Sequence, residues 1–77
     1  MSRIILTFET THAVMAAERA LKEAASKGFK FRPTPTPSGL SDSICGMSLE
    51  ILSAQQKDEI VEHLKSRGRS PKGVHVI

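Results

Sequence analysis

The chain begins with an alternation of hydrophobic and polar positions. Residues 3–8 place three apolar side chains on one side of an extended backbone, and these are Ile4, Leu6 and Phe8. A period of two is typical of a strand that is buried on one side only. We therefore expect the first strand at residues 3–8.

The apolar period changes to that of a helix directly afterwards. Small and aliphatic residues recur every three or four positions, at Val14, Ala17, Leu21 and Ala24. Thr10 or Thr11 can cap the start of this helix, and Gly28 supplies a stop at its end. The pattern predicts a first helix over residues 11–27, with Leu21 as its main apolar anchor.

Three prolines follow a short second alternation. Phe29 and Phe31 alternate with basic residues and predict a brief strand. Proline lacks the amide hydrogen that a sheet ladder needs, so Pro33, Pro35 and Pro37 are expected to end this strand. We interpret the segment after it as a stiffened loop in which Pro35 and Pro37 form a structural turn.

The second half of the chain shows the same kinds of pattern. Residues 47–51 alternate as a third strand, and Ser53-Ala54-Gln55-Gln56 matches a capping box that starts a second helix. Apolar residues at 60, 61 and 64 form one stripe of this helix, which Gly68 ends. Residues 74–77 read as a closing fourth strand.

This order of elements predicts an α+β fold. Strand, helix, strand, strand, helix, strand is the order of a ferredoxin-like split sandwich, in which two helices cover one face of a four-stranded antiparallel sheet. Residues 1–77 fit one small domain. The other face of the sheet should be mostly polar and solvated, and would carry Arg3, Ile5, Thr7, Lys30, Arg32, Ser48, Glu50, His75 and Ile77. Such a face argues against a large apolar dimer interface, so we expect a monomer or a weak dimer.

Composition and charge restrict the function further. No apolar stretch is long enough to span a membrane, and we expect a cytoplasmic protein. The net charge of +3 permits an acidic partner. Nucleic acid is disfavoured because the expected third strand carries no aromatic side chain on which bases could stack. His12, His63, His75 and the single cysteine have no metal-ligand spacing, and no cofactor motif is present.

Cys45 is the only cysteine of the chain, and it lies between Ser41 and Gly46. It is either a small buried hydrophobic residue or a reactive thiol that meets other molecules. In the expected fold the start of the third strand lies beside the end of the first, which brings Cys45 near Thr11 and His12 at the start of the first helix. A helix N-terminus favours anions and increases the thiolate fraction of a cysteine placed there. Gly46 would let a partner's backbone approach the sulfur.

The densest group of cations lies after the second helix. It consists of Lys65, Arg67, Arg69 and Lys72. The connection that carries these residues is expected to return to the end of the molecule where the thiol lies. One interpretation is a surface that docks an acidic partner protein, and the other is a solvated helix end that complements its own dipole.

Several short motifs resemble a known family in their order and spacing. They are Thr11-His12-Ala13, Ala17-Glu18, Pro35-Thr36-Pro37, and Ser41 followed by Cys45-Gly46. Together they resemble the selenium/sulfur (Se/S) carrier protein-like family of small bacterial proteins. The resemblance implies that Cys45 carries sulfur or selenium and that Pro35, Pro37 and Gly46 frame it. Members often have an arginine and an acidic residue after the second proline, where this chain has Ser38 and Gly39.

Two hypotheses of function remain from the sequence. In the first, Cys45 holds a persulfide-type sulfur or selenium and relays it from a donor protein to an acceptor protein. In the second, the chain is a thiol-independent module that binds a small molecule or a protein, since this fold hosts many such roles. No complete catalytic set is present, so a carrier or binding protein is favoured over a stand-alone enzyme.

Overall fold

The computed structural model describes residues 3–37, 39–40 and 46–77. Its strands and α-helices are β1 (Ile4–Thr7), α1 (Thr11–Glu23), β2 (Phe31–Pro35), β3 (Met47–Ile51), α2 (Lys57–Ser66) and β4 (Gly73–Val76). Short 3-10 turns at Ala25–Lys27 and Ala54–Gln56 follow α1 and precede α2. The predicted α+β class and the predicted order of strands and helices are therefore confirmed.

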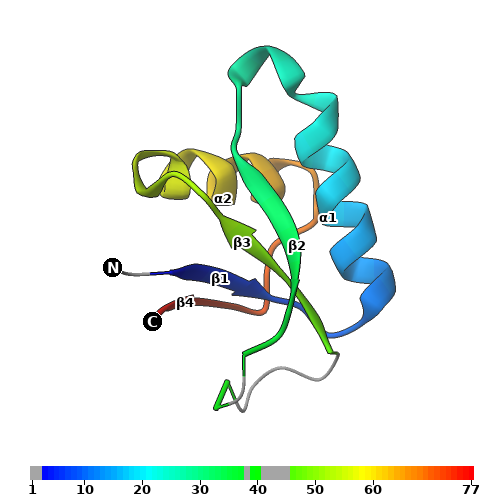
Figure 1. Ribbon diagram of the computed structural model, residues 1–77. Helices are drawn as coiled ribbons and strands as arrows, with labels where there is room; N and C mark the ends of the chain where they lie inside the picture. The colour runs from blue at the N-terminus through cyan, green and yellow to red at the C-terminus, as the bar shows by residue number, and fades with distance from the viewer. Residues whose placement is uncertain (1–2, 38, 41–45) are drawn as a thin grey trace.

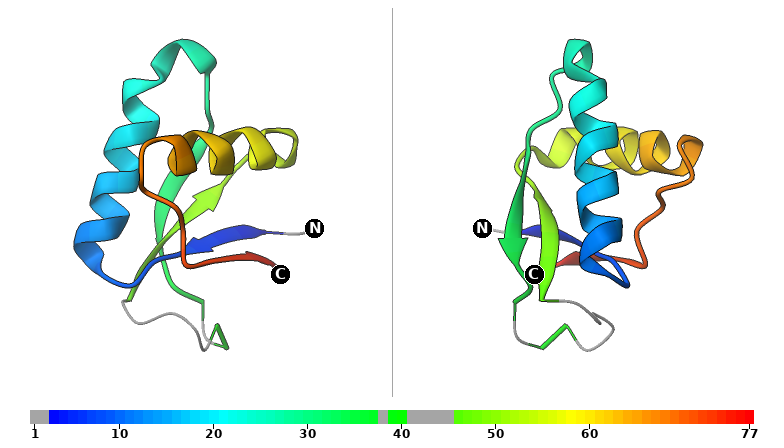
Figure 2. Two further views of the ribbon diagram at one scale, coloured as in Figure 1. Left: turned by 180° about the vertical axis from the view of Figure 1, so that it is seen from behind. Right: turned by 90° about the vertical axis from the view of Figure 1, so that its right-hand side faces the viewer.

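The four strands form one sheet in the order β2-β3-β1-β4, and each neighbouring pair is antiparallel. Both helices cover the same face of this sheet, and α2 crosses α1 rather than running parallel to it (Figures 1 and 2). The core lies between the two layers. Its members include apolar residues of β1, β3 and both helices, among them Leu6, Leu21, Leu49, Ile60 and Leu64.

Helix α1 begins and ends for local reasons that the sequence indicated. Thr10 has an extended backbone, and its hydroxyl accepts a hydrogen bond of 3.0 Å from the Ala13 amide. Leu21 is buried, as expected of the main anchor. The α-helix stops at Glu23, and a 3-10 turn continues to Gly28, which adopts a left-handed φ of 67°. The predicted end at residue 27 therefore belongs to the 3-10 turn.

The prediction that prolines end the second strand was wrong. Strand β2 contains both Pro33 and Pro35. It lies at the edge of the sheet and pairs only with β3, and the Thr36 amide donates to the Gly46 carbonyl at 2.9 Å. Since hydrogen-bonding residues alternate along a strand, Pro33 and Pro35 turn their nitrogens to the outer edge. No ladder hydrogen bond is lost there, which is how edge strands accept proline.

The predicted capping box of the second helix was also wrong. Ser53 makes no side-chain cap, and a 3-10 turn leads into α2 instead. The Gln56 side chain accepts a hydrogen bond from the Lys30 amide at 2.8 Å and donates to the Gly28 carbonyl at 3.0 Å. These two bonds attach the start of α2 to the α1–β2 loop, and that tertiary pairing replaces the local cap.

The sheet face opposite the helices is mostly polar, as predicted, and its basic side chains stay partly exposed, but it also holds a hydrogen-bonded cluster around a buried carboxylate. Glu50 on β3 accepts hydrogen bonds of 3.0–3.2 Å from the guanidinium groups of Arg3 and Arg32. Thr7 contacts His75 Nε2 at 3.3 Å, and Ile5 beside it is fully buried. The register, with Ile5 opposite both Glu50 and His75, confirms that these residues share one face. Paired charges and hydrogen bonds allow the Glu50 carboxylate to be buried on this face, while the two guanidinium groups that pair with it stay partly exposed.

Candidate functional site

Two residues of the predicted site, Ser41 and Cys45, lie outside the described residues. Gly46 is the first described residue after them, and it is exposed. Its carbonyl accepts the Thr36 amide, which fixes the point where the chain enters β3. Pro37 lies just past the end of β2. The structure thus describes the chain on both sides of the cysteine segment.

The start of β3 lies beside the end of β1, as the topology predicted. Ile4 pairs with Ile51 and Leu6 pairs with Leu49, so Met47 lies toward the end of β1 where the chain turns into α1. Figure 1 shows the start of β3 and the start of α1 at the same end of the sheet. Thr11 and His12 are the first two residues of α1, and both are exposed there.

The N-terminus of α1 carries a partial positive charge that no acidic side chain of its first turn offsets. The first turn contains no acidic residue, and the Thr10 hydroxyl satisfies only the amide of Ala13 among the first amides. The amides at this end of a helix have no partner within the helix, and their dipoles favour a nearby anion. This end of α1 is therefore suited to an anionic group.

The connection from α2 to β4 returns to this same end of the molecule. The Lys72 amide donates to the Thr7 carbonyl at 2.7 Å, at the end of β1. Arg69 and Ser70 line a shallow hollow together with Thr10 and His12. The predicted return of the basic segment toward the start of α1 is confirmed for these residues, and Figure 2 shows the path of the connection.

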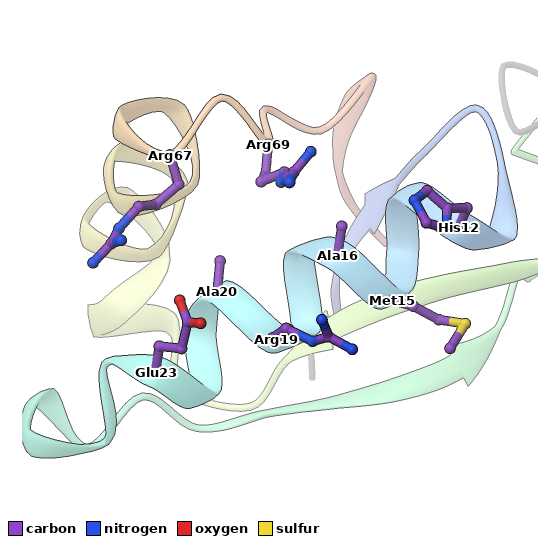
Figure 3. A pocket seen from close by; sticks show the side chains of 8 residues that line it. All are labelled: His12, Met15, Ala16, Arg19, Ala20, Glu23, Arg67 and Arg69. Atoms are coloured by element: carbon purple, nitrogen blue, oxygen red, sulfur yellow. The ribbon is translucent and has the colours of Figure 1, made fainter.

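The four predicted cations do not face one common surface. Arg67 and Arg69 line a groove of about 300 Å³ against α1, which Figure 3 shows from close by. Lys65 lines a separate hollow beside Val74, and Lys72 lies in another with Glu9. Among the described residues, the groove is lined by His12, Met15, Ala16, Arg19, Ala20, Glu23, Arg67 and Arg69.

The groove has an excess of positive charge. Three arginines line it, Arg19 from α1 and Arg67 and Arg69 from the opposite wall, against one acidic residue among the described lining, Glu23 (Figure 3). Within the described part of the chain, the ion pairs join other residues, and none of these three arginines takes part in one. Three unpaired guanidinium groups around one hollow favour an acidic occupant.

Arg19 was not predicted from the sequence as part of the site. It follows His12 by seven residues and therefore lies on the same side of α1, two turns later. That spacing was visible in the sequence. What the sequence lacked was the position of α1 against the α2–β4 connection, which brings Arg67 and Arg69 to the opposite wall.

Within residues 3–37, 39–40 and 46–77, no group of three or more His, Cys, Asp or Glu side chains is arranged to hold a metal ion. Neither of the α-helices in that part of the chain is long and apolar enough to cross a membrane.

Comparison with known proteins gives one result. A family described as "Putative Se/S carrier protein-like" matches residues 3–76, which is nearly the whole chain. No curated protein and no solved structure matches the chain.

Proposed function

The chain belongs to the Se/S carrier protein-like family, and from this premise we propose that Cys45 holds a sulfur or selenium atom and relays it from a donor protein to an acceptor protein. The observation that carries the proposal is the match over residues 3–76 in a chain with a single cysteine. A carrier needs only one thiol, because it forms no disulfide of its own. We place this activity in the cytoplasm, where a lone thiol stays reduced.

The proposed transfer exchanges one S–S bond for another, so it needs no added oxidant or reductant. The Cys45 thiolate attacks the outer sulfur of a donor persulfide, R–S–SH. A new S–S bond forms on Cys45, the donor's S–S bond breaks, and the donor leaves as its thiolate. An acceptor nucleophile then attacks the outer sulfur of Cys45–S–SH and releases the Cys45 thiolate. With selenium, the held species is Cys45–S–SeH.

The described residues on either side of Cys45 support a reactive thiol. Gly46 enters β3 at the end of the sheet where α1 begins, and the first turn of α1 has no carboxylate to oppose an anion. Thr11 and His12 are exposed at that end. A cysteine beside a helix N-terminus has a larger thiolate fraction, and thiolate is the nucleophilic form. We propose that Thr11, His12 and Gly46, with Ser41, surround the transfer site.

The groove between α1 and the α2–β4 connection is proposed as the docking surface for an acidic partner. Arg67 and Arg69 belong to the cation cluster seen in the sequence, and Arg19 adds a third charge to them. Lys65 and Lys72 line other hollows, so we expect them to add to the positive field of the molecule rather than to the groove itself. A positive surface near the thiol would accelerate encounter with a negatively charged donor.

The groove also favours the second hypothesis, a binding module that does not use the thiol. Its volume of about 300 Å³ is at the lower end of the range for small-molecule sites, and its lining offers several polar groups. In that case an acidic small molecule or peptide would bind equally well to wild type and to Cys45→Ser. The carrier hypothesis requires that Cys45→Ser abolish transfer.

A cyanolysis experiment tests the carrier function. The chain is incubated with a cysteine desulfurase and cysteine, purified away from both, and treated with cyanide, which removes an outer persulfide sulfur as thiocyanate. We expect about one thiocyanate per chain from wild type, because the chain has one thiol. Cys45→Ser should yield none. Equal thiocyanate from both proteins would mean that the sulfur was carried over with the donor and would refute the proposal.

A further inference from the structure

The two edges of the sheet differ in how they can meet another strand. On β2, the outward-facing positions include Pro33 and Pro35, which have no amide hydrogen to donate. On β4, the other edge strand, the corresponding positions are valines. Edge strands with free backbone groups are templates for pairing with another chain, and proline is one of the residues that prevent it. Only the β2 edge carries this protection.

Hydrogen bonding identifies the outward-facing residues of β4. Arg3 and Ile77 exchange two backbone hydrogen bonds, of 2.6 and 2.8 Å, so Ile77 faces β1. By alternation along the strand, His75 also faces β1, while the amides and carbonyls of Val74 and Val76 point to the open edge. A second strand laid along this edge would meet all four of these backbone groups.

The side chains at this edge are apolar and exposed. Val74 is 41% exposed and Val76 is 59% exposed. Valine is also a residue that favours strands, so both positions suit pairing with a further strand. Val74 also lines a hollow of about 250 Å³ beside α2, next to the half-buried Val61. The edge therefore combines unpaired backbone groups with an apolar strip that extends to the neighbouring helix.

Charges around this strip are balanced in sign. The same hollow is lined by two basic and two acidic side chains of α2, namely Lys57, Asp58, Glu62 and Lys65. None of the ion pairs in the described ranges involves these four residues. A twofold interface places the same patch on both sides, so it must complement itself. A neutral patch of two basic and two acidic side chains around valines can do so, whereas the arginine-lined groove cannot.

We propose that two copies of the chain pair antiparallel through β4 and join their sheets into one continuous sheet. The twofold axis passes beside His75, so that Val74 exchanges two backbone hydrogen bonds with the partner's Val76, and Val76 does the same with the partner's Val74. The two α2 helices then lie next to each other across the axis. There, basic residues of one copy meet acidic residues of the other.

Sedimentation velocity of the full chain over a wide range of concentrations tests this pairing. A thiol reductant is present throughout, so that a disulfide between two Cys45 residues does not produce a dimer. We expect a reversible dimer of wild type, and a dimer weakened about tenfold or more in Val74→Lys with Val76→Lys, because like charges then face each other across the edge. Met15→Lys is the matched control, since Met15 is also 59% exposed but lies on α1. It should dimerise as wild type does.

Amide hydrogen exchange gives a second measurement that does not depend on a variant. The amides of residues 74 and 76 should be protected at high concentration and should exchange faster on dilution, while the amides of 75 and 77 stay protected by β1. A wild type that is monomeric at every concentration would overturn the proposal. So would a dimer that the double lysine variant leaves intact, since it would use another surface.

Discussion

Glu50 shows what single residues contribute on the helix-free face of the sheet. Its side chain is 9% exposed, and the guanidinium groups of Arg3 and Arg32 both donate hydrogen bonds to it. The sequence placed all three residues on one face because β-strands alternate. It did not reveal that one carboxylate would join the arginines of two neighbouring strands, because that depends on the pairing of β1, β2 and β3 in register.

We expect Glu50→Gln to destabilise the fold by about 1–3 kcal/mol at neutral pH, because two charge-assisted hydrogen bonds lose their charged acceptor. Urea unfolding followed by circular dichroism measures this change. Glu18→Gln is the control, since within the described ranges the Glu18 side chain forms one 3.8 Å ion pair, with the exposed Lys22, and the substitution should change stability by less than about 0.5 kcal/mol. Equal effects of the two substitutions would refute a special role of Glu50.

The hydrogen bonds between Glu50 and the two arginines also predict how stability depends on pH. Hydrogen bonds from Arg3, and then from Arg32, hold the pKa of Glu50 below its ordinary value of 4.5 in the folded chain, against the opposing effect of burial. A carboxylate whose pKa is lower when folded contributes stability above its unfolded pKa and loses it as pH falls through the folded pKa. The stability difference between wild type and Glu50→Gln should therefore shrink as pH falls below about 4.5. A difference that stays constant into acid would contradict this assignment.

Most strands and helices could be predicted from their local sequence patterns, and the two wrong predictions have identifiable physical causes. Strands β1 and β3 alternate clearly, and α1 has a cap, an apolar stripe and a glycine stop. Strand β2 was cut short because the effect of a proline depends on which side of the strand its nitrogen faces, and that is a property of the sheet. The start of α2 was misassigned because Gln56 bonds to the α1–β2 loop, which is distant in sequence.

Thr10 provides a test of helix capping, the local rule that correctly predicted where α1 begins. We expect Thr10→Ala to cost about 1 kcal/mol of stability, because the Ala13 amide loses the hydroxyl that caps it. Thr11→Ala is the control, since Thr11 is already inside the helix and exposed. Thermal unfolding of both variants checks the prediction. A Thr11→Ala effect as large as that of Thr10→Ala would mean that the cap is not the stabilising contact.

At the scale of the whole molecule, the position of the candidate site could be predicted better from the order of the strands than from the distribution of charge along the chain. The sheet order requires the start of β3 to lie beside the start of α1, so that part of the site was predictable. The sequence left two interpretations of the cation cluster, a docking surface or a solvated helix end. In the structure Arg67 and Arg69 line the same groove, whereas Lys65 and Lys72 each line another hollow. Which cations share a groove depends on how the α2–β4 connection packs on α1, and charge density along the chain does not contain that information.

Charge reversal within the groove tests docking. We expect Arg67→Glu with Arg69→Glu to slow loading of Cys45 by a desulfurase roughly tenfold at low salt, because steering by the positive surface is lost. The difference from wild type should shrink at physiological salt, where the Debye length is about 8 Å. Lys22→Glu with Lys27→Glu is the control, since it changes the net charge equally but lies outside the groove. Equal slowing in both variants would show that only net charge matters.

The central claim is that Cys45 carries the transferred atom, and the intact mass of the chain tests it most directly. Wild type and Cys45→Ser are each incubated with a cysteine desulfurase and cysteine, then measured by mass spectrometry before and after treatment with a thiol reductant. We expect wild type to gain the mass of one sulfur atom, the reductant to remove it, and Cys45→Ser to gain nothing. A wild-type chain that gains no sulfur, while the desulfurase itself acquires a persulfide, would show that Cys45 is not the carrier.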